Sequence, residues 1–366
     1  MSTNNRTGRK RDYVGVLSSV FAIVIGLLVG FVILLICNPS QALPGFVTIL
    51  TGAFTHGLKG VGQVFYYATP IILTGLSVGF AFKTGLFNIG TPGQFIVGAF
   101  AAVYVGIMWT GLGRIQWAVA LLAAILGGAL WGMVPGFLKA CFNVNEVIAS
   151  IMMNYIGMYM VNWIVKSYKP LFNNLRNESR NVAATAQIPK MGMDKLFPES
   201  SVGGGILLAV AAVLLIWVIL NKTTFGYELK AVGFNRDASR YAGINEKRNI
   251  IMSMVIAGAI AGMAGGLLYL AGTGKHIEIK DVLASEGFTG ISVALLGLSH
   301  PIGVLFSGLF IAYLTAGGFY LQLFEFSTEI IDIIVAVIIY FSAFALIVKT
   351  ILTRMNRKRE KGDGRT

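Results

Sequence analysis

The sequence predicts an all-α, polytopic membrane protein: a bundle of about ten transmembrane helices. The 366 residues are 55% hydrophobic and only 12% charged, about half of the roughly 25% charged residues in a soluble domain. The charges gather in short stretches between long apolar runs. Backbone groups inside a bilayer must be satisfied within their own segment, so these runs must be helices. Runs such as IIVAVIIY also lack the alternation of a membrane β-barrel.

Ten spans follow when about 20 apolar residues are assigned to each. The span at 286–299 is short and rich in glycine, so we expect a half-spanning or broken segment there. The first span is too long for a signal peptide and is interpreted as a retained anchor. The expected spans are 14–37, 62–82, 91–109, 115–138, 145–166, 203–221, 249–271, 286–299, 302–320 and 329–349.

The distribution of basic residues predicts the orientation of the chain. The net charge is +13, but the basic residues flank apolar spans and are not interleaved with aromatic residues. They therefore indicate the cytoplasmic side of a membrane rather than a nucleic-acid site. Both terminal segments are basic, so an even number of spans places both termini in the cytoplasm. The predicted organisation is a cytoplasmic segment at 1–13, a transmembrane domain at 14–349 and a basic cytoplasmic tail at 350–366.

The inventory of reactive side chains argues against an enzyme. The three histidines, His56, His276 and His300, lie at span edges or in loops and lack metal-ligand spacing. The cysteines, Cys37 and Cys141, are too far apart in sequence to suggest a metal site. The stretch GTGKH at 272–276 lacks the glycine and hydroxyl residues of a phosphate-binding loop. We expect no catalytic residue, metal, cofactor or nucleotide site.

Two rows of glycine predict close helix packing. Small residues repeated every four positions let helix backbones approach one another in a membrane. The rows are Gly128, Gly132 and Gly136 in one span and Gly258, Gly262 and Gly266 in another.

Two polar features are candidates for a solute path. The stretch FKTGLFNIGTPGQF at 82–95 places irregular backbone between two spans, which is tolerated where a cavity or protein covers it; an ordinary tight turn is the alternative. The stretch NEVIASIMMNY places Glu146, Ser150 and Asn154 on one helix face. That face should point to the bundle interior or a cavity, and hydrogen bonding between helices is its alternative. The path residues we predict are Phe87, Asn88, Gln94, Ser150, Asn154 and Tyr155.

A third feature is the segment at 222–248, predicted to be cytoplasmic. It has mixed charges, and a short amphipathic helix is expected around Asp237 to Ala242, between Gly233 and Gly243. A transporter without its own energy source needs a surface on which a separate motor can act. A solvated connector is the alternative, which the apolar residues of this segment disfavour.

Four motifs together resemble the permease subunits of bacterial ABC importers. They are GLFNIGTPGQFIVGA, NEVIASIMMNY, ELKAVGFNRDASRYAGI and FTGISVALLGLSHPIG, which cover roughly residues 60–350. The group is the branched-chain amino acid, ribose and simple-sugar permease superfamily, and the match is closest to its nucleoside-importing branch. That branch typically has an acidic residue before Gly-Gln in the first motif, where this chain has Thr91-Pro92-Gly93-Gln94.

The resemblance implies an importer fold of two five-helix halves with inverted topology, in the bacterial cytoplasmic membrane. It also implies a second permease subunit, cytoplasmic ABC ATPase subunits and an extracytoplasmic substrate-binding lipoprotein. Nucleosides are the expected small-molecule cargo, with simple sugars or branched-chain amino acids as alternatives; no nucleic acid is expected. By the resemblance, the residues that couple the permease to the ATPase are Gly233, Asn235, Asp237, Ala238, Arg240, Ala242 and Gly243.

An ion-coupled secondary transporter is the rival class. It would need buried carboxylates in its spans, and the nearest candidates, Glu286, Glu329 and Asp332, lie at predicted span ends.

Overall fold

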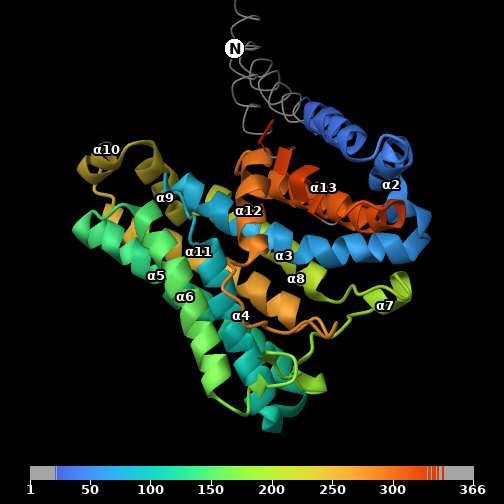
Figure 1. The fold of residues 1–366 in the computed structure, drawn as a ribbon. Coiled ribbons are helices and arrows are strands. Elements are labelled where there is room, and N and C mark those ends of the chain that lie inside the picture. The colour runs from blue at the N-terminus through green and yellow to red at the C-terminus, as the bar shows by residue number, and fades with distance from the viewer. Residues whose placement is uncertain are drawn as a thin grey trace, which may run out of the picture. The chain divides into compact units, whose positions relative to one another are not determined.

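The computed structural model describes residues 21, 23–327, 329–330, 332–334, 336–337 and 340–341. The described residues are almost entirely helical (Figure 1). The chain divides into two compact units. One consists of residues 1–53 and 314–366, and the other consists of residues 54–313. The candidate functional residues lie in the second unit.

Seven of the described helices are long and apolar enough to cross a membrane. The α-helices are Ile23–Cys37, α2 (Ala42–Thr55), α3 (Gly57–Lys83), α4 (Thr91–Met108), α5 (Gln116–Phe142), α6 (Glu146–Ser167), α7 (Met193–Leu196), α8 (Gly205–Lys222), α9 (Thr224–Phe234), α10 (Arg236–Tyr241), α11 (Glu246–Tyr269), α12 (Ser285–Leu296) and α13 (Pro301–Phe319). Short 3-10 helices cover Thr110–Ile115, Ala184–Ala186 and Tyr320–Phe324.

The expected spans from 62–82 to 302–320 each coincide with a helix. The short segment expected at 286–299 is confirmed as α12, whose twelve residues are about 18 Å long and cannot cross a bilayer alone. The helix α2, which follows the first helix after a short turn, was not among the expected spans. The last expected span lies largely outside the described residues, as does part of the first. The number of ten spans stays a prediction.

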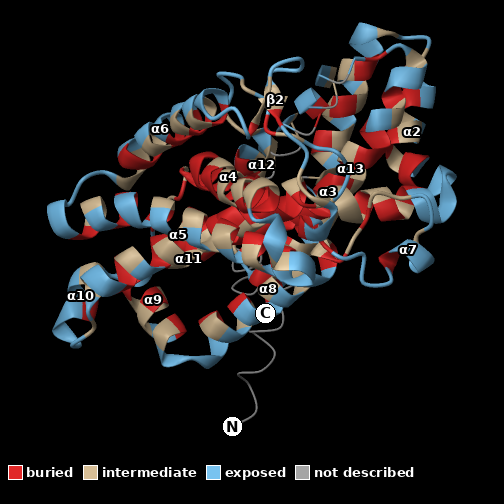
Figure 2. Ribbon diagram, turned by 90° about the horizontal axis from the view of Figure 1, so that it is seen from below, coloured by how far each residue is buried: buried red, intermediate tan, exposed pale blue. Residues whose placement is uncertain are grey.

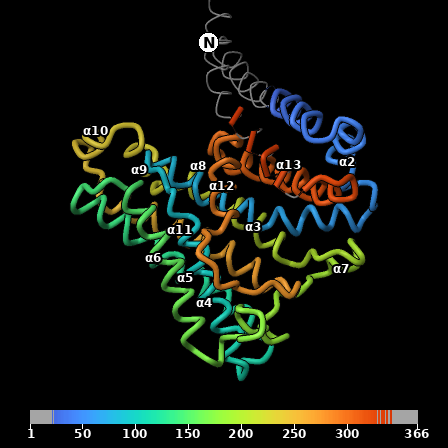
Figure 3. The backbone as a smooth tube through the Cα atoms, in the orientation of Figure 1, coloured from blue at the N-terminus to red at the C-terminus, as the bar shows by residue number. Residues whose placement is uncertain are grey.

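The centre of the second unit is formed by α3, α4, α5 and α11, which pack against one another. Buried residues gather along α3, α4 and α11 (Figure 2). The two predicted glycine rows face each other where α5 and α11 run side by side (Figure 3). A methyl group on Gly128 would overlap the backbone of Gly258, and one on Gly136 would come within 2.8 Å of the Met254 Cβ. The predicted close packing is confirmed.

The first turn of α12 has one buried position, Gly287, while Ser285 and Phe288 beside it are exposed. A Cβ on Gly287 would come within 2.6 Å of the Pro92 Cα, and one on Gly290 within 2.6 Å of the Thr74 carbonyl carbon. Thr74 is in the middle of α3, and Pro92 is in the buried first turn of α4. One face of α12 therefore packs against the break between α3 and α4 and against the middle of α3.

A compact loop connects α6 to α8. It contains a two-stranded antiparallel sheet, β1 (Phe172–Asn173) and β2 (Glu178–Ser179). The Ser179 amide donates to the Ile277 carbonyl at 2.9 Å, and the Ile277 amide donates to the Ser179 hydroxyl at 3.0 Å. This pairing fixes the loop to the segment between α11 and α12. Helical periodicity contains no signal for such a pairing between loops.

The other unit packs through small residues as well. The rings of Phe31 and Phe46 lie 5.0 Å apart. A Cβ on Gly45 would come within 2.9 Å of the Phe326 ring. These contacts join α2 to the helix before it and to the segment that follows α13.

Candidate functional site

The segment at 222–248 folds as two short helices, because a polar side chain caps each new helix. The Thr223 hydroxyl accepts a hydrogen bond from the Gly226 amide at 3.1 Å at the start of α9. The Asn235 side chain accepts from the Ala238 amide at 2.9 Å and starts α10. Asn245 does the same for α11. Such caps satisfy amides that the helix itself leaves without partners. The expected short helix is confirmed as α10.

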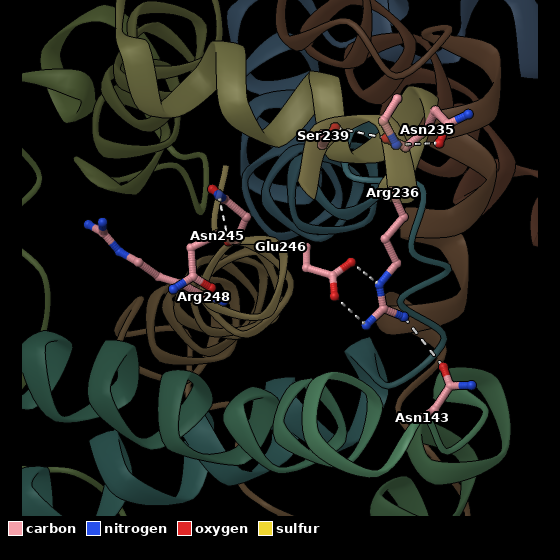
Figure 4. A network of polar contacts seen from close by, with 9 residues as sticks. Asn143, Asn235, Arg236, Ser239, Asn245, Glu246 and Arg248 are labelled. Atoms are coloured by element: carbon pink, nitrogen blue, oxygen red, sulfur yellow. Dashed lines mark hydrogen bonds and ion pairs between the residues drawn. The ribbon is translucent and has the colours of Figure 1, made fainter. Parts of the chain in front are cut away.

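An arginine fork fixes α10 to the helices beside it (Figure 4). Arg236 contacts both carboxylate oxygens of Glu246, at 2.6 and 3.5 Å. Its third nitrogen donates to the Asn143 side chain at 3.4 Å, at the turn between α5 and α6. That turn is closed by an ion pair of 2.9 Å between Lys139 and Glu146. Paired arginine–carboxylate contacts add directional specificity to charge attraction, so α10 is held in a defined position.

The predicted coupling residues all lie on the exposed side of this segment. Beside them, Phe234 and Tyr241 are 91% and 94% exposed, so large apolar side chains and charges share one surface. Sequence reasoning missed Arg236 and Glu246, although opposite charges on either side of a turn were a usable signal. The exposed residues are Gly233, Asn235, Asp237, Ala238, Arg240, Ala242 and Gly243.

The end of α9 rests on the turn that follows α3. A Cβ on Gly233 would come within 2.9 Å of the Thr84 carbonyl carbon and 3.0 Å of the Gly85 nitrogen, and would overlap the Lys83 carbonyl oxygen. Gly85 has a φ of +72°, a conformation that favours glycine. The Thr84 hydroxyl bonds the Ser253 hydroxyl of α11 at 2.7 Å. Two backbones are thus in direct contact where the segment at 222–248 meets the break between α3 and α4.

The break between α3 and α4 carries a buried cluster of amide side chains. The Asn88 Nδ2 donates to the Gln94 Oε1 at 2.9 Å, and the Gln94 Nε2 returns a bond to the Asn88 Oδ1 at 3.1 Å. Asn154 of α6 accepts from the Gly93 amide and donates to the Ile89 carbonyl, both at 2.9 Å. These mutual bonds satisfy groups that would be costly to bury alone. The three amide side chains therefore hold the break together in this conformation.

The other predicted path residues lie around this cluster. Ser150 is fully buried beside Gly90, and its hydroxyl has no hydrogen-bond partner among the described residues. The ring of Phe87 stacks on Phe82 with 5.3 Å between centroids. Tyr155 lies on the exposed face of α6. The structure thus brings Asn88, Gln94, Asn154 and Ser150 together and directs Tyr155 elsewhere.

A cavity of about 280 Å³ lies between the segment at 222–248 and the turns after α3 and α5. The arginine fork and the ion pair that closes the turn after α5 both contribute side chains to it. Its lining residues are Thr84, Gly85, Leu86, Lys139, Glu146, Val232, Gly233, Phe234, Asn235, Arg236 and Ile250. Within the part of the chain that the structure describes, no group of three or more His, Cys, Asp or Glu residues could hold a metal ion.

Comparison with known families identifies this architecture. Residues 60–343 match the profile of the family described as "Branched-chain amino acid transport system / permease component". The chain belongs to this permease family. With seven helices able to cross a membrane, the permease is a multi-pass membrane protein. It is a transport component rather than an enzyme.

The permease is similar over most of its length to curated proteins. The guanosine ABC transporter permease protein NupP of Bacillus subtilis is 38% identical, over 93% of this chain and 96% of the relative. The nucleoside ABC transporter permease protein NupB of Lactococcus lactis is 34% identical, over 96% and 95%. The glucose ABC transporter permease protein TsgB13 of Haloferax volcanii is 32% identical, over 81% and 78%.

A second permease from each of the first two organisms is also similar. These are NupQ of Bacillus subtilis at 28% identity and NupC of Lactococcus lactis at 26% identity, over 70% or less of this chain. No solved structure matches the permease significantly.

Proposed function

We propose that this chain is the larger of two permease subunits in an ATP-driven importer of nucleosides. The assignment of nucleosides as the cargo rests on the similarity of this chain to NupP and NupB, which extends over almost the whole length of the chain and of each relative. Their names specify guanosine and nucleosides, whereas TsgB13, which is named for glucose, is matched over a shorter part. A simple sugar is the second candidate cargo, and a branched-chain amino acid, from the family description, is the third.

The partners follow from the same relatives and from the coupling segment. NupP and NupQ are both named guanosine ABC transporter permeases in one organism, and NupB and NupC are both named nucleoside ABC transporter permeases in another. We therefore expect a paralogous second permease. The exposed Phe234 and Tyr241 beside the charges of α10 form a surface suited to cytoplasmic ATPase subunits. An extracytoplasmic binding lipoprotein would deliver the solute.

In this proposal the coupling segment transmits ATPase movement into the transmembrane helices. The fork between Arg236 and Glu246 ties α10 to α11, and Gly233 rests on the break after α3. A displacement of α10 would therefore reach two core helices at once and favour one of two conformations. The seven exposed residues from Gly233 to Gly243 would form or shape the contact surface.

The same proposal includes the topology expected from the sequence. It has about ten transmembrane helices, the half-length α12 among them, in two inverted five-helix halves, with both termini and the segment at 222–248 on the cytoplasmic side. The loop between α6 and α8 would then lie outside. Membrane-impermeant labelling of Tyr241→Cys and Leu175→Cys tests this orientation, since only the second should react in intact cells.

One ion pair argues against an ion-coupled transporter. The carboxylate of Glu286 pairs with the Lys275 ammonium at 3.0 Å. A charged partner disfavours the proton uptake and release that such coupling requires.

The deciding experiment is uptake of radiolabelled guanosine in a strain without nucleoside uptake, complemented with this chain, its expected second permease, ATPase and lipoprotein. We expect uptake that depends on ATP and is blocked by unlabelled adenosine but not by glucose or leucine. An ATPase variant that cannot hydrolyse ATP is the control. Competition by glucose alone would reassign the cargo, and uptake that survives ATPase inactivation would refute the importer mechanism.

A further inference from the structure

The start of α12 combines features that packing alone does not require. This half-length helix begins at the exposed Ser285, and its buried face packs Gly287 against Pro92 at the break between α3 and α4. A segment of fifteen residues without helix, 270–284, leads into it from α11. Interrupted helices of this kind place their ends where a solute passes in membrane transporters.

An ion pair occupies this helix start. Lys275 Nζ lies 3.0 Å from Glu286 Oε1, and the two side chains are only 41% and 25% exposed. The second carboxylate oxygen, Oε2, accepts a long hydrogen bond of 3.4 Å from the Ser285 hydroxyl. A carboxylate can accept about four hydrogen bonds, so Oε2 retains capacity for another donor. The pair is therefore accessible to a solute at the start of α12.

Lys275 stays charged in this setting. Partial burial disfavours its ammonium form, but the Glu286 carboxylate, the hydrogen bond to it and the nearby Tyr66 and Tyr67 outweigh burial and hold the pKa of Lys275 above its ordinary value. The pair therefore offers a permanent donor and a permanent acceptor side by side.

Two tyrosines of α3 complete the arrangement. The Tyr66 hydroxyl bonds the Thr273 hydroxyl at 3.1 Å. Tyr67 meets Tyr66 edge to face, with 5.4 Å between ring centroids. Both rings are half-buried, and both lie close enough to Lys275 to act on its charge. The residues Tyr66, Tyr67, Thr273, Lys275 and Glu286 are called the α12 mouth below.

We propose that the α12 mouth is a transit site for the solute, in which the Glu286 carboxylate accepts hydrogen bonds from the ribose hydroxyls of a nucleoside. This inference rests on the proposed function and specifies it further. Aromatic rings can stack on the base, while Lys275 donates to ring or carbonyl oxygens. The buried amides at the break after α3 bond one another in this conformation, whereas the Glu286 carboxylate is partly exposed.

The test compares transport of guanosine and 2′-deoxyguanosine by the complete importer. Both solutes are supplied at saturation, so that the preference of the binding lipoprotein cancels. We expect wild type to transport guanosine several-fold faster than the deoxy compound. Glu286→Gln should slow guanosine by about tenfold, the effect of losing a charge-assisted hydrogen bond, and remove the preference. The matched control is Lys280→Gln, which breaks an exposed pair with Glu278 and should change neither rate.

A second readout does not depend on transport. Thr273→Cys in the assembled complex should react with a thiol reagent, and guanosine should slow that reaction at least several-fold. Unchanged rates and an unchanged preference in Glu286→Gln would overturn the inference. Equal slowing of both solutes, with reduced thermal stability and no protection of Thr273→Cys, would show a structural ion pair and overturn it too. A wild type that transports neither solute would refute the proposed function instead.

Discussion

Gly233→Ala is the sharpest perturbation that the structure offers. The new methyl group would lie 2.9 Å from the Thr84 carbonyl carbon and 3.0 Å from the Gly85 nitrogen, and would overlap the Lys83 carbonyl oxygen. All three neighbours are backbone atoms that cannot turn aside as a side chain can. The end of α9 must therefore separate from the turn after α3, which interrupts the contact between the coupling segment and the helix break.

The magnitude follows from that overlap. Adding one methyl group to a tightly packed contact costs about 1–3 kcal/mol. If the cost falls on only one of the two conformations between which an importer alternates, it changes their ratio by about 5- to 150-fold. We expect guanosine uptake to fall by at least about fivefold, while ATP hydrolysis by the assembled complex stays near the wild-type rate.

The assay measures uptake and ATP hydrolysis on the same membrane preparations, together with the thermal stability of the solubilised complex. Gly111→Ala is the matched control, because a Cβ there meets no atom within 4 Å. Wild-type uptake in Gly233→Ala would refute the reasoning. Equal losses of uptake, hydrolysis and thermal stability would refute it as well, since they would indicate misfolding rather than lost coupling.

Three further predictions concern other parts of the same unit. Gly243, among the predicted coupling residues, has a φ of +79°, so Gly243→Leu should reduce uptake and leave the rate of ATP hydrolysis unchanged. The control is Gly192→Leu, at a φ of +83° in the loop between α6 and α8, which should reduce neither rate. Asn154→Leu leaves two buried backbone groups without their 2.9 Å bonds at about 1–3 kcal/mol each; it should lower the thermal midpoint of the complex, while Tyr155→Leu on the exposed face should not. Because the pKa of Lys275 is raised, its contribution is present below the ordinary lysine pKa and is lost only as the pH rises through the raised value. The contribution of Lys275 to uptake should therefore stay constant between about pH 6 and about pH 9, and a change with pH in the ratio of wild-type to Lys275→Gln uptake near neutrality would contradict this.

The helices could be predicted from the sequence because backbone groups inside lipid must form hydrogen bonds within their own segment. Apolar runs of about 20 residues must be helical, and the expected span at 62–82 is α3. The glycine rows of α5 and α11 were predictable for the same reason, since their spacing is set by helix geometry. The helix α2 was missed because spans were assigned from apolar runs of about 20 residues, and α2 has only fourteen.

The site was only partly predictable. The motifs pointed to Asn88, Gln94 and Asn154, and the structure brings these side chains together. The sequence could not reveal that the amides satisfy one another, because that depends on which rotamers the packed helices allow. The pair of Lys275 and Glu286 was missed for a related reason: its members are eleven positions apart, in a segment without periodicity.

The facing glycine rows restrict how the permease can change shape. Backbone lies on backbone along α5 and α11, so sliding one helix along the other would drive carbonyl groups into Cα atoms at several turns together. These two helices should therefore travel as a single rigid body, and the opening and closing of a passage must come from helices that pack through larger, more adaptable side chains. Since α11 begins at Glu246, inside the arginine fork, a force applied at α10 would displace this whole pair rather than bend either helix.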